Sequence, residues 1–320
     1  MWLAVRCFAV TSTPADPSAD RASNGEGRVA AAWPWVLRAV WFLLPFSVGS
    51  SFGDALSTRS APVRLTALGL AWVWWGLGLL STLVPHPIGL VIIRVCAPLA
   101  FVVAVWATTT GVAYSAVSGF GLAVSVVVCA LSFSANTGHL YVNGPAYPNE
   151  RRYLLRPPAL LLLGPIPLAG AAAASGTVLG PLLVASGAWV FGGLAFAVGV
   201  AAAFVAARAL YVFTRRFLVF VPAGFVVHDF ESLRDPVLFK RQTIEGIRAA
   251  AVDSDSLDLT AKAPGLTIEV LLREKVEITK VRNSRDTGEV GKTARFLVVP
   301  SMPGRFLTAA AKRRYPTGPR

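Results

Sequence analysis

The most constraining feature of this sequence is a long stretch that contains almost no charge. The chain has 320 residues, of which 30 are basic and 17 are acidic. The charged residues between Ala55 and Ala207 are Arg59, Arg64, Arg94, Glu150, Arg151, Arg152 and Arg156. Charged residues make up 15% of the chain, against about 25% in an average soluble protein, and the mean hydropathy is +0.59. The composition therefore argues against a soluble enzyme and predicts that this stretch lies in lipid.

Six apolar segments are long enough to cross a bilayer as helices, because about 20 apolar residues cover the roughly 30 Å of hydrocarbon. They are Trp35–Gly53, Val63–Val84, Ile88–Ala107, Gly111–Phe133, Pro158–Ser175 and Leu182–Ala207. The first contains Arg38 and Pro45, so both a crossing helix and an interfacial helix stay open for it. The sequence predicts a polytopic α-helical membrane domain of about six spans over residues 33–210. A Pro/Ser/Ala/Asp-rich disordered tail is expected before it, at residues 1–32.

Basic residues beside the spans predict the orientation. With six spans, the N-terminal tail, the loop with Arg151, Arg152 and Arg156, and the region after the last span share one side of the membrane. Arg59 and Arg64 lie on the other side. Since loops rich in arginine and lysine stay in the cytoplasm, we expect a multi-pass protein of the bacterial plasma membrane with a cytoplasmic C-terminal domain.

The composition changes at about Tyr211, where a domain with strand-like periodicity begins. Residues 208–320 contain 20 basic and 12 acidic residues, a net charge of +8. The predicted strands are Arg216–Val221, Gly224–His228, Val237–Lys240, Ile244–Arg248, Leu257–Ala261, Leu266–Leu272, Val276–Val281 and Arg295–Val299. Helical spacing follows over Pro303–Arg314. These patterns predict a small, mainly-β domain over residues 211–315, a bent sheet closed by a C-terminal helix, with a short tail at residues 316–320.

Two short motifs of this domain resemble a known family. The pattern Tyr211-x-x-Thr214-x-Arg216 with the later Gly224 is similar to the opening of bacterial membrane-associated PH-like domains. The segment Thr243-Ile-Glu-Gly-Ile247 is similar to the short strand that follows in that family. The Ala/Gly/Val/Arg-rich spans resemble those of actinobacterial multi-pass membrane proteins. The resemblance covers about a third of the chain and implies a PH-like fold without an activity. About six spans, in place of the usual two, are a departure from the family.

The motifs that would indicate catalysis, a cofactor or a metal are incomplete. Cys7, Cys96 and Cys129 share no metal-ligand spacing, and the three histidines are scattered. Gly288–Thr293 has two residues between its glycines where a phosphate loop needs four, so a hairpin turn is expected. The basic C-terminal region has no signature of nucleic-acid binding. We therefore expect no enzyme, no cofactor and no nucleic-acid partner.

Basic side chains are the candidate contacts with anionic lipid headgroups or with a protein partner. They are Arg94, Arg151, Arg152, Arg156, Arg215, Arg216, Lys240, Arg241, Arg313 and Arg314. Arg94 lies within an apolar span, where it either snorkels or pairs structurally, or else contacts a substrate or lipid. The favoured hypothesis is an integral membrane protein that displays a cytoplasmic PH-like domain to bind a protein or anionic lipid. The alternative is a transporter or channel component that the domain regulates.

Overall fold

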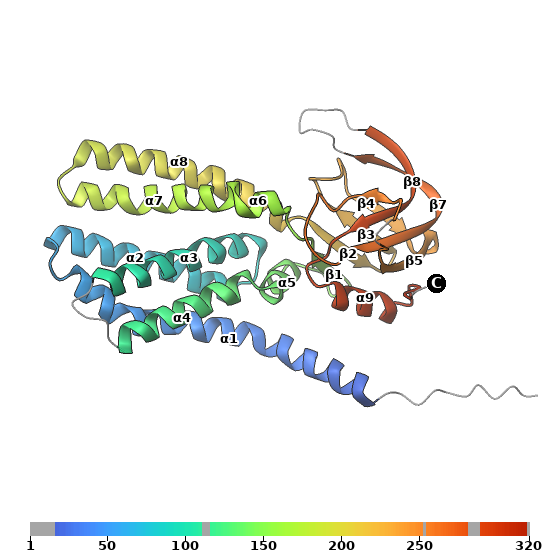
Figure 1. Cartoon of the computed structure of the whole chain (residues 1–320), viewed down its shortest axis with the longest axis horizontal. Coiled ribbons are helices and arrows are strands. Elements are labelled where there is room, and N and C mark those ends of the chain that lie inside the picture. Colours follow the sequence, from blue (N-terminus) through green and yellow to red (C-terminus); the bar gives the residue numbers. More distant parts are fainter. Residues whose placement is uncertain (1–16, 111–115, 252–253, 281–288, 319–320) are drawn as a thin grey trace, which may run out of the picture.

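The computed structural model describes residues 17–110, 116–251, 254–280 and 289–318 of the chain. A bundle of long helices forms one end of the molecule, and a β domain forms the other (Figure 1). The bundle contains α1 (Pro17–Leu56), α2 (Ala61–Leu83), α3 (Pro87–Thr110), α4 (Ala116–Phe133), α7 (Pro165–Ala185) and α8 (Trp189–Thr214). Two short helices, α5 (Ala135–Asn143) and α6 (Ala159–Leu163), lie between the bundle and the β domain.

Five helices are long and apolar enough to cross a membrane: Val29–Leu56 of α1, and the whole of α2, α3, α4 and α8. The segment Trp35–Gly53, for which crossing was open, lies within the first of these. Helix α7 has 21 residues and runs beside α8, and its part Gly170–Ala185 is also apolar. The prediction of a multi-pass helical membrane protein is therefore confirmed.

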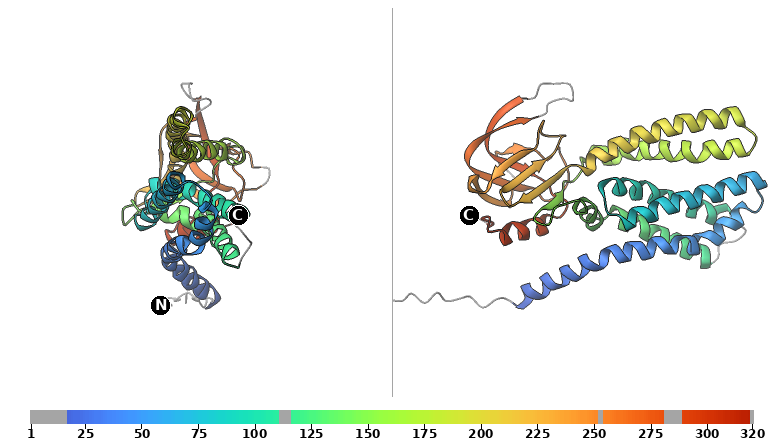
Figure 2. Two further views of the ribbon diagram at one scale, coloured as in Figure 1. Left: turned by 90° about the vertical axis from the view of Figure 1, so that its left-hand side faces the viewer. Right: turned by 180° about the vertical axis from the view of Figure 1, so that it is seen from behind.

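The ends of the helices fall on two sides of the bundle. The N-terminal end of α1, the α2–α3 connection, α5 and both outer ends of the α7–α8 hairpin lie at the end of the bundle that carries the β domain (Figures 1 and 2). The α1–α2 connection and the α7–α8 turn lie at the opposite end. Six long helices run between these two ends, and five of them are candidate spans by length and composition, where the sequence predicted about six.

Two predicted boundaries in the helical part are wrong. Helix α1 begins at Pro17, so residues 17–32 are helical instead of belonging to a disordered tail, while residues 1–16 lie outside the described part. Alanine, arginine and glutamate in this segment favour helix, and it continues directly into the apolar part of α1. The α7–α8 turn lies at residues 186–188, inside the expected sixth span. Gly187 has a φ of +93° there, a conformation that glycine adopts without strain.

Besides a core of large side chains that includes Trp41 and Ile93, the bundle buries small, hydroxyl-bearing side chains, and many large apolar side chains lie on its outside. Ser47, Ser125 and Ser132 are buried, and each hydroxyl donates to a backbone carbonyl of its own helix. Phe191 and Phe204 of α8 are 74% and 70% exposed. This pattern is typical of helices that pack through small residues and face lipid with their bulky ones.

The β domain contains two four-stranded sheets. Their orders are β1-β2-β3-β4 and β5-β7-β8-β6, with antiparallel neighbours except for the parallel pair β6 and β8. The strands are β1 (Arg151–Leu154), β2 (Phe217–Val221), β3 (Gly224–His228), β4 (Val237–Lys240), β5 (Ile244–Ala249), β6 (Leu257–Asp258), β7 (Ile268–Lys280) and β8 (Glu289–Val298). A bridge between Leu155 and Pro300 connects the two sheets beyond β1 and β8. Helix α9 (Pro303–Lys312) buries Phe306 and Ala310 in the core that both sheets share.

The β domain also contains a strand from the region expected to be a membrane loop. Strand β1 pairs with β2, from Arg151 opposite Phe220 to Leu154 opposite Phe217. The membrane hairpin α7–α8 is thus inserted between two adjacent strands of one sheet, and the boundary expected at residue 211 is wrong. The segment is only four residues long and carries two arginines, so the sequence pattern indicated a basic loop beside a span.

Three further predictions about the β domain need correction. The expected strands Leu266–Leu272 and Val276–Val281 are one strand, β7, whose register shifts between Leu271 and Val276. Glu289–Thr293, the part of the phosphate-loop-like segment that is described, belongs to strand β8. The tail expected at residues 316–320 starts too early, because Ile247 N donates to Pro316 O at 2.9 Å.

Candidate functional site: two basic hollows

The structure brings some of the predicted contact residues together and separates others. Arg241, Arg313 and Arg314 line one hollow, together with Lys312. Arg151 lines a second hollow. The residues that line neither of these two are Arg94, Arg152, Arg156, Arg215, Arg216 and Lys240.

The first hollow, which we call the distal hollow, is open, has a volume of about 540 Å³ and is lined by four cationic residues. Three of them come from the end of α9, where the helix dipole favours positive charge. The fourth, Arg241, follows β4 in the short 3₁₀ helix η1 (Arg241–Thr243). The Arg241 guanidinium lies 5.1 Å from the ring centroid of buried Tyr315. The distal hollow therefore combines a strong positive potential with a surface partly held in place by an aromatic core residue.

The end of α9 is shaped by a non-glycine residue in a strained backbone conformation. Arg314 has a φ of +59°. Arg314 N donates to Ala311 O at 2.8 Å, and Tyr315 N donates to Ala310 O at 3.0 Å. These two bonds form a Schellman motif, whose left-handed position is usually glycine. The chain thus holds an exposed arginine where glycine would be less strained.

The distal hollow faces away from the bundle. The C-terminal end of α9 lies on the side of the β domain farthest from α2, α3, α7 and α8 (Figures 1 and 2). The four cationic residues of the distal hollow therefore gather at the end of the β domain that lies away from the bundle.

The second hollow, which we call the junction hollow, has a volume of about 250 Å³ and lies between the bundle and the β domain. Its lining includes Trp33 of α1, Pro85 of the α2–α3 connection, Asn136 and His139 of α5, Arg151 of β1 and Arg305 of α9. Burial, together with the positive charges of Arg305 and Arg151, lowers the pKa of His139 to about 4. The imidazole is therefore neutral near pH 7.

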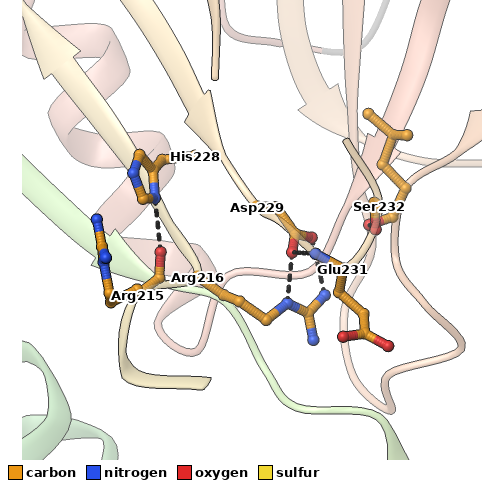
Figure 3. A network of polar contacts seen from close by, with 7 residues as sticks. Arg215, Arg216, His228, Asp229, Glu231 and Ser232 are labelled. Atoms are coloured by element: carbon orange, nitrogen blue, oxygen red, sulfur yellow. Dashed lines mark hydrogen bonds and ion pairs between the residues drawn. The ribbon is translucent and has the colours of Figure 1, made fainter. Parts of the chain in front are cut away.

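Arg216 is a structural residue, so the prediction that it contacts lipid or a partner is wrong. Its side chain is buried, and its Nε and Nη2 donate to Oδ1 and Oδ2 of Asp229 at 2.6 and 2.8 Å (Figure 3). Asp229 Oδ1 also accepts from Glu231 N at 3.0 Å. The Arg216 carbonyl accepts from Leu155 N at 2.9 Å. The ion pair thus fixes the point at which α8 enters the β domain and β1 joins it.

Arg152 and Arg156 are also tied to the protein. Arg152 pairs with Glu150 at 3.1 Å, and its backbone N–H donates to Asn143 Oδ1 at 2.9 Å. Asn143 Nδ2 in turn donates to the Arg152 carbonyl at 2.8 Å, so this side chain connects α5 to β1. Arg156 donates from Nη1 to the Pro264 carbonyl at 3.2 Å.

The three other predicted contacts differ in exposure. Arg94 donates from Nε to the Ser132 carbonyl at 3.4 Å and lies 5.9 Å from the ring centroid of Phe133, which favours its structural interpretation. Arg215 is exposed at the end of α8, and its guanidinium lies beside the ring of Phe230. Lys240 is exposed at the end of β4. Contact of Arg215 or Lys240 with a partner stays a prediction.

Several residues that line the two hollows were not among the predicted contacts. Lys312 lies directly before the predicted contacts Arg313 and Arg314. Asn136 and His139 lie in a short polar helix after α4, and Arg305 lies 169 residues from Asn136, to which its Nη1 donates at 3.1 Å. The helical spacing predicted the helix itself, but no local pattern could bring α9 next to α5.

Comparisons of this chain with family models, with curated proteins and with solved structures find no match. The likeness to membrane-associated PH-like domains stays a prediction from the sequence.

Proposed function

We propose that this protein is an integral membrane protein whose β domain recruits an acidic protein partner to the cytoplasmic face of a bacterial plasma membrane. The observation that carries the proposal is the distal hollow, with its four cationic residues at the end of the β domain that faces away from the bundle. Anionic groups on a soluble protein can reach this side directly. Lipids of the membrane that the protein spans would have to reach around the β domain.

Several observations support a PH-like fold and a cytoplasmic location for the β domain. The two sheets, the bridge between them and the closing helix α9 agree with a PH-like fold. The basic residues of the β domain, which include Arg151 of β1, lie on the same side of the bundle as Arg38, whose Nε donates to the Thr82 carbonyl near the end of α2, and this bias favours the cytoplasm. Attachment of the domain to a membrane helix raises the local concentration of any partner that it binds.

The alternative, a transporter or channel component, has less support from the described residues. Arg94 lines neither hollow and donates to a backbone carbonyl at the end of α4. Asp54 is exposed near the end of α1. We therefore propose a non-catalytic recruitment role and no substrate path through the bundle.

The direct test uses the full-length protein in zwitterionic nanodiscs and a fluorescent oligoglutamate peptide as the probe. We expect binding that weakens as salt rises. The double variant Arg241→Glu with Arg313→Glu should reduce affinity about tenfold or more, because like charges then oppose the peptide. The matched control is Lys262→Glu with Lys292→Glu, an equal change of charge at exposed positions of the β domain that do not line the distal hollow.

A second variant separates binding from folding. Arg314→Gly removes one cation of the distal hollow and also relieves the left-handed backbone, so its folding stability should stay equal or rise by up to about 1 kcal/mol. Its affinity for oligoglutamate should nevertheless fall. Equal losses in the Lys262 and Lys292 control, or unchanged binding in both hollow variants, would contradict the proposed recruitment surface.

A further inference from the structure

The junction hollow lies at the level where the apolar spans end. Trp33 lies near the start of the candidate span Val29–Leu56, and Pro85 follows the end of α2. Asn136 and His139 belong to α5, which begins two residues after the end of α4. Arg305 is near the start of α9, the end of that helix that approaches α5. This hollow therefore lies at the membrane–water interface, unlike the distal hollow.

The lining of the junction hollow supplies groups that suit a phosphate. Arg151 and Arg305 provide two guanidinium groups, which match the oxygen atoms of a phosphate in charge and geometry. The lining residues that the structure describes include no aspartate or glutamate. Arg305 also donates to Asn136 Oδ1 at 3.1 Å, so its guanidinium is held at the hollow by α5.

The walls of this hollow are fixed before any ligand binds. Trp33 Nε1 donates to Thr137 Oγ1 at 2.9 Å, which joins α1 to α5. Asn143 joins α5 to the Arg152 backbone through both ends of its carboxamide. The close approach of Gly144 to the Pro85 carbonyl leaves no room for a Cβ atom, so the end of α5 and the α2–α3 connection are in contact.

The electrostatic surroundings agree with a positive site. The lowered pKa of His139 has burial as its largest cause, followed by the charges of Arg305 and then Arg151. Both guanidinium groups therefore act on the same ring, and their positive potentials overlap inside the hollow. A bound anion would offset the repulsion between the two guanidinium groups.

We propose that the junction hollow binds the phosphate group of an anionic phospholipid headgroup. Its volume of about 250 Å³ is below the roughly 300–1,000 Å³ of sites for drug-sized ligands, so it fits a headgroup and leaves the acyl chains in the bilayer. The apolar side chains of Trp33, Pro85 and Leu140 in the lining suit the glycerol end of such a lipid. The bound lipid connects α1, α5, β1 and α9.

The test measures the melting temperature of the full-length protein in a non-ionic detergent. Short-chain phosphatidylglycerol, short-chain phosphatidylcholine and inorganic phosphate are titrated separately. A ligand that binds only the folded state raises its stability. We expect phosphatidylglycerol to raise the melting temperature more than either of the other two at equal concentration.

The variant Arg151→Gln should raise the half-saturating concentration of phosphatidylglycerol about fivefold, since each arginine near a membrane surface contributes about that factor. The matched control is Arg59→Gln, which removes one charge from an exposed position in the α1–α2 connection, at the opposite end of the bundle. The melting temperature without lipid checks that both variants fold.

Three results would overturn this proposal. The first is an equal effect of phosphatidylcholine, and the second is an equal loss in Arg59→Gln. The third is an equal effect of inorganic phosphate at equal concentration, which would identify a soluble anion as the ligand. The oligoglutamate experiment concerns the distal hollow alone, so failure of either proposal leaves the other standing.

Discussion

At the scale of single residues, the Arg216–Asp229 pair gives Arg216 a structural role that differs from the surface contact predicted for it. Arg216 belongs to the Tyr-x-x-Thr-x-Arg pattern, and its charge indicated a surface contact. The structure instead buries it, with an exposed fraction of 1% for each partner. A buried charge is stable only when it is paired and hydrogen bonded. Arg216 therefore stabilises the junction of α8 with the β domain.

We expect Asp229→Asn to destabilise the folded protein by about 3–5 kcal/mol, because it leaves the buried guanidinium without its countercharge. The control is Glu231→Gln, which removes the same charge from an exposed side chain two residues away. Amide hydrogen exchange of β2 and β3 in the full-length protein over a denaturant series measures the difference. Similar stabilities of the two variants would show that the ion pair is dispensable.

The junction hollow predicts a dependence of stability on pH. The pKa of His139 falls from its ordinary 6.5 to about 4 in the folded protein, because of burial and the nearby Arg305 and Arg151. Between pH 6.5 and pH 4 the unfolded chain therefore binds a proton that the folded chain does not, and stability falls as the pH falls. Below about pH 4 both states are protonated and this loss is complete.

Melting temperatures at about pH 7 and about pH 5 measure this effect, since the two values lie on either side of the ordinary histidine pKa. The pKa of His228 is also lowered, chiefly by burial, so it adds to the slope in the same direction. His139→Gln should flatten the dependence without abolishing it. An unchanged pH dependence of the melting temperature in His139→Gln would show that the pKa of His139 is not lowered in the folded protein.

At the scale of elements, the α7–α8 hairpin depends on glycine contacts. A Cβ atom on Gly199 would collide with the backbone of Gly176 and would lie 2.8 Å from Thr177 N, whereas a Cβ atom on Gly193 meets nothing within 4 Å. Both glycines belong to α8. Close packing of small residues is a main source of helix association in lipid.

We therefore expect Gly199→Val to destabilise the hairpin by about 1–3 kcal/mol through overpacking. Gly193→Val, the same substitution at an open position of the same helix, should be nearly neutral. Disulfide crosslinking between cysteines introduced in α7 and α8 of the membrane-embedded protein measures how closely the helices approach. Equal crosslinking in both variants would argue against this contact.

Most elements could be predicted from the sequence, but some of their partners could not. The strands β3 and β4 match their predicted bounds, because short apolar runs between turn residues identify them directly. Strand β1 was missed, since its four residues gain their partner, β2, from a segment beyond two intervening membrane helices. The α7–α8 turn was misplaced because glycines mark both turns and close helix contacts. The two hollows depend on tertiary proximity, which residue types alone do not specify.

At the scale of the whole molecule, the β domain and the bundle form one connected structure. Leu154 and Phe217 pack with the core of the bundle, while Tyr153 and Leu155 belong to the core of the β domain. Strand β1 and the residue after it thus contribute side chains to both cores. The bundle and the β domain are thus joined by side-chain packing as well as by the continuous chain.

This connection predicts that residues 211–320 do not form a stable domain alone, because the edge of β2 and the core positions of Tyr153 and Leu155 are then empty. Residues 150–156 joined by a flexible linker to residues 215–320, without the membrane hairpin, should give a folded domain. Amide hydrogen exchange of the two proteins tests this, with protection of β2 expected only in the second. Equal protection of β2 in both would contradict the assigned role of β1.

The measurement that tests the account most directly is cysteine labelling from the two sides of the membrane. In a protein whose native Cys7, Cys96 and Cys129 are replaced, single cysteines are introduced at Lys312, in the distal hollow, and at Thr58, in the α1–α2 connection. A membrane-impermeant maleimide should label position 58 in intact cells and position 312 only in inverted vesicles. Labelling of position 312 in intact cells would contradict a cytoplasmic recruitment surface.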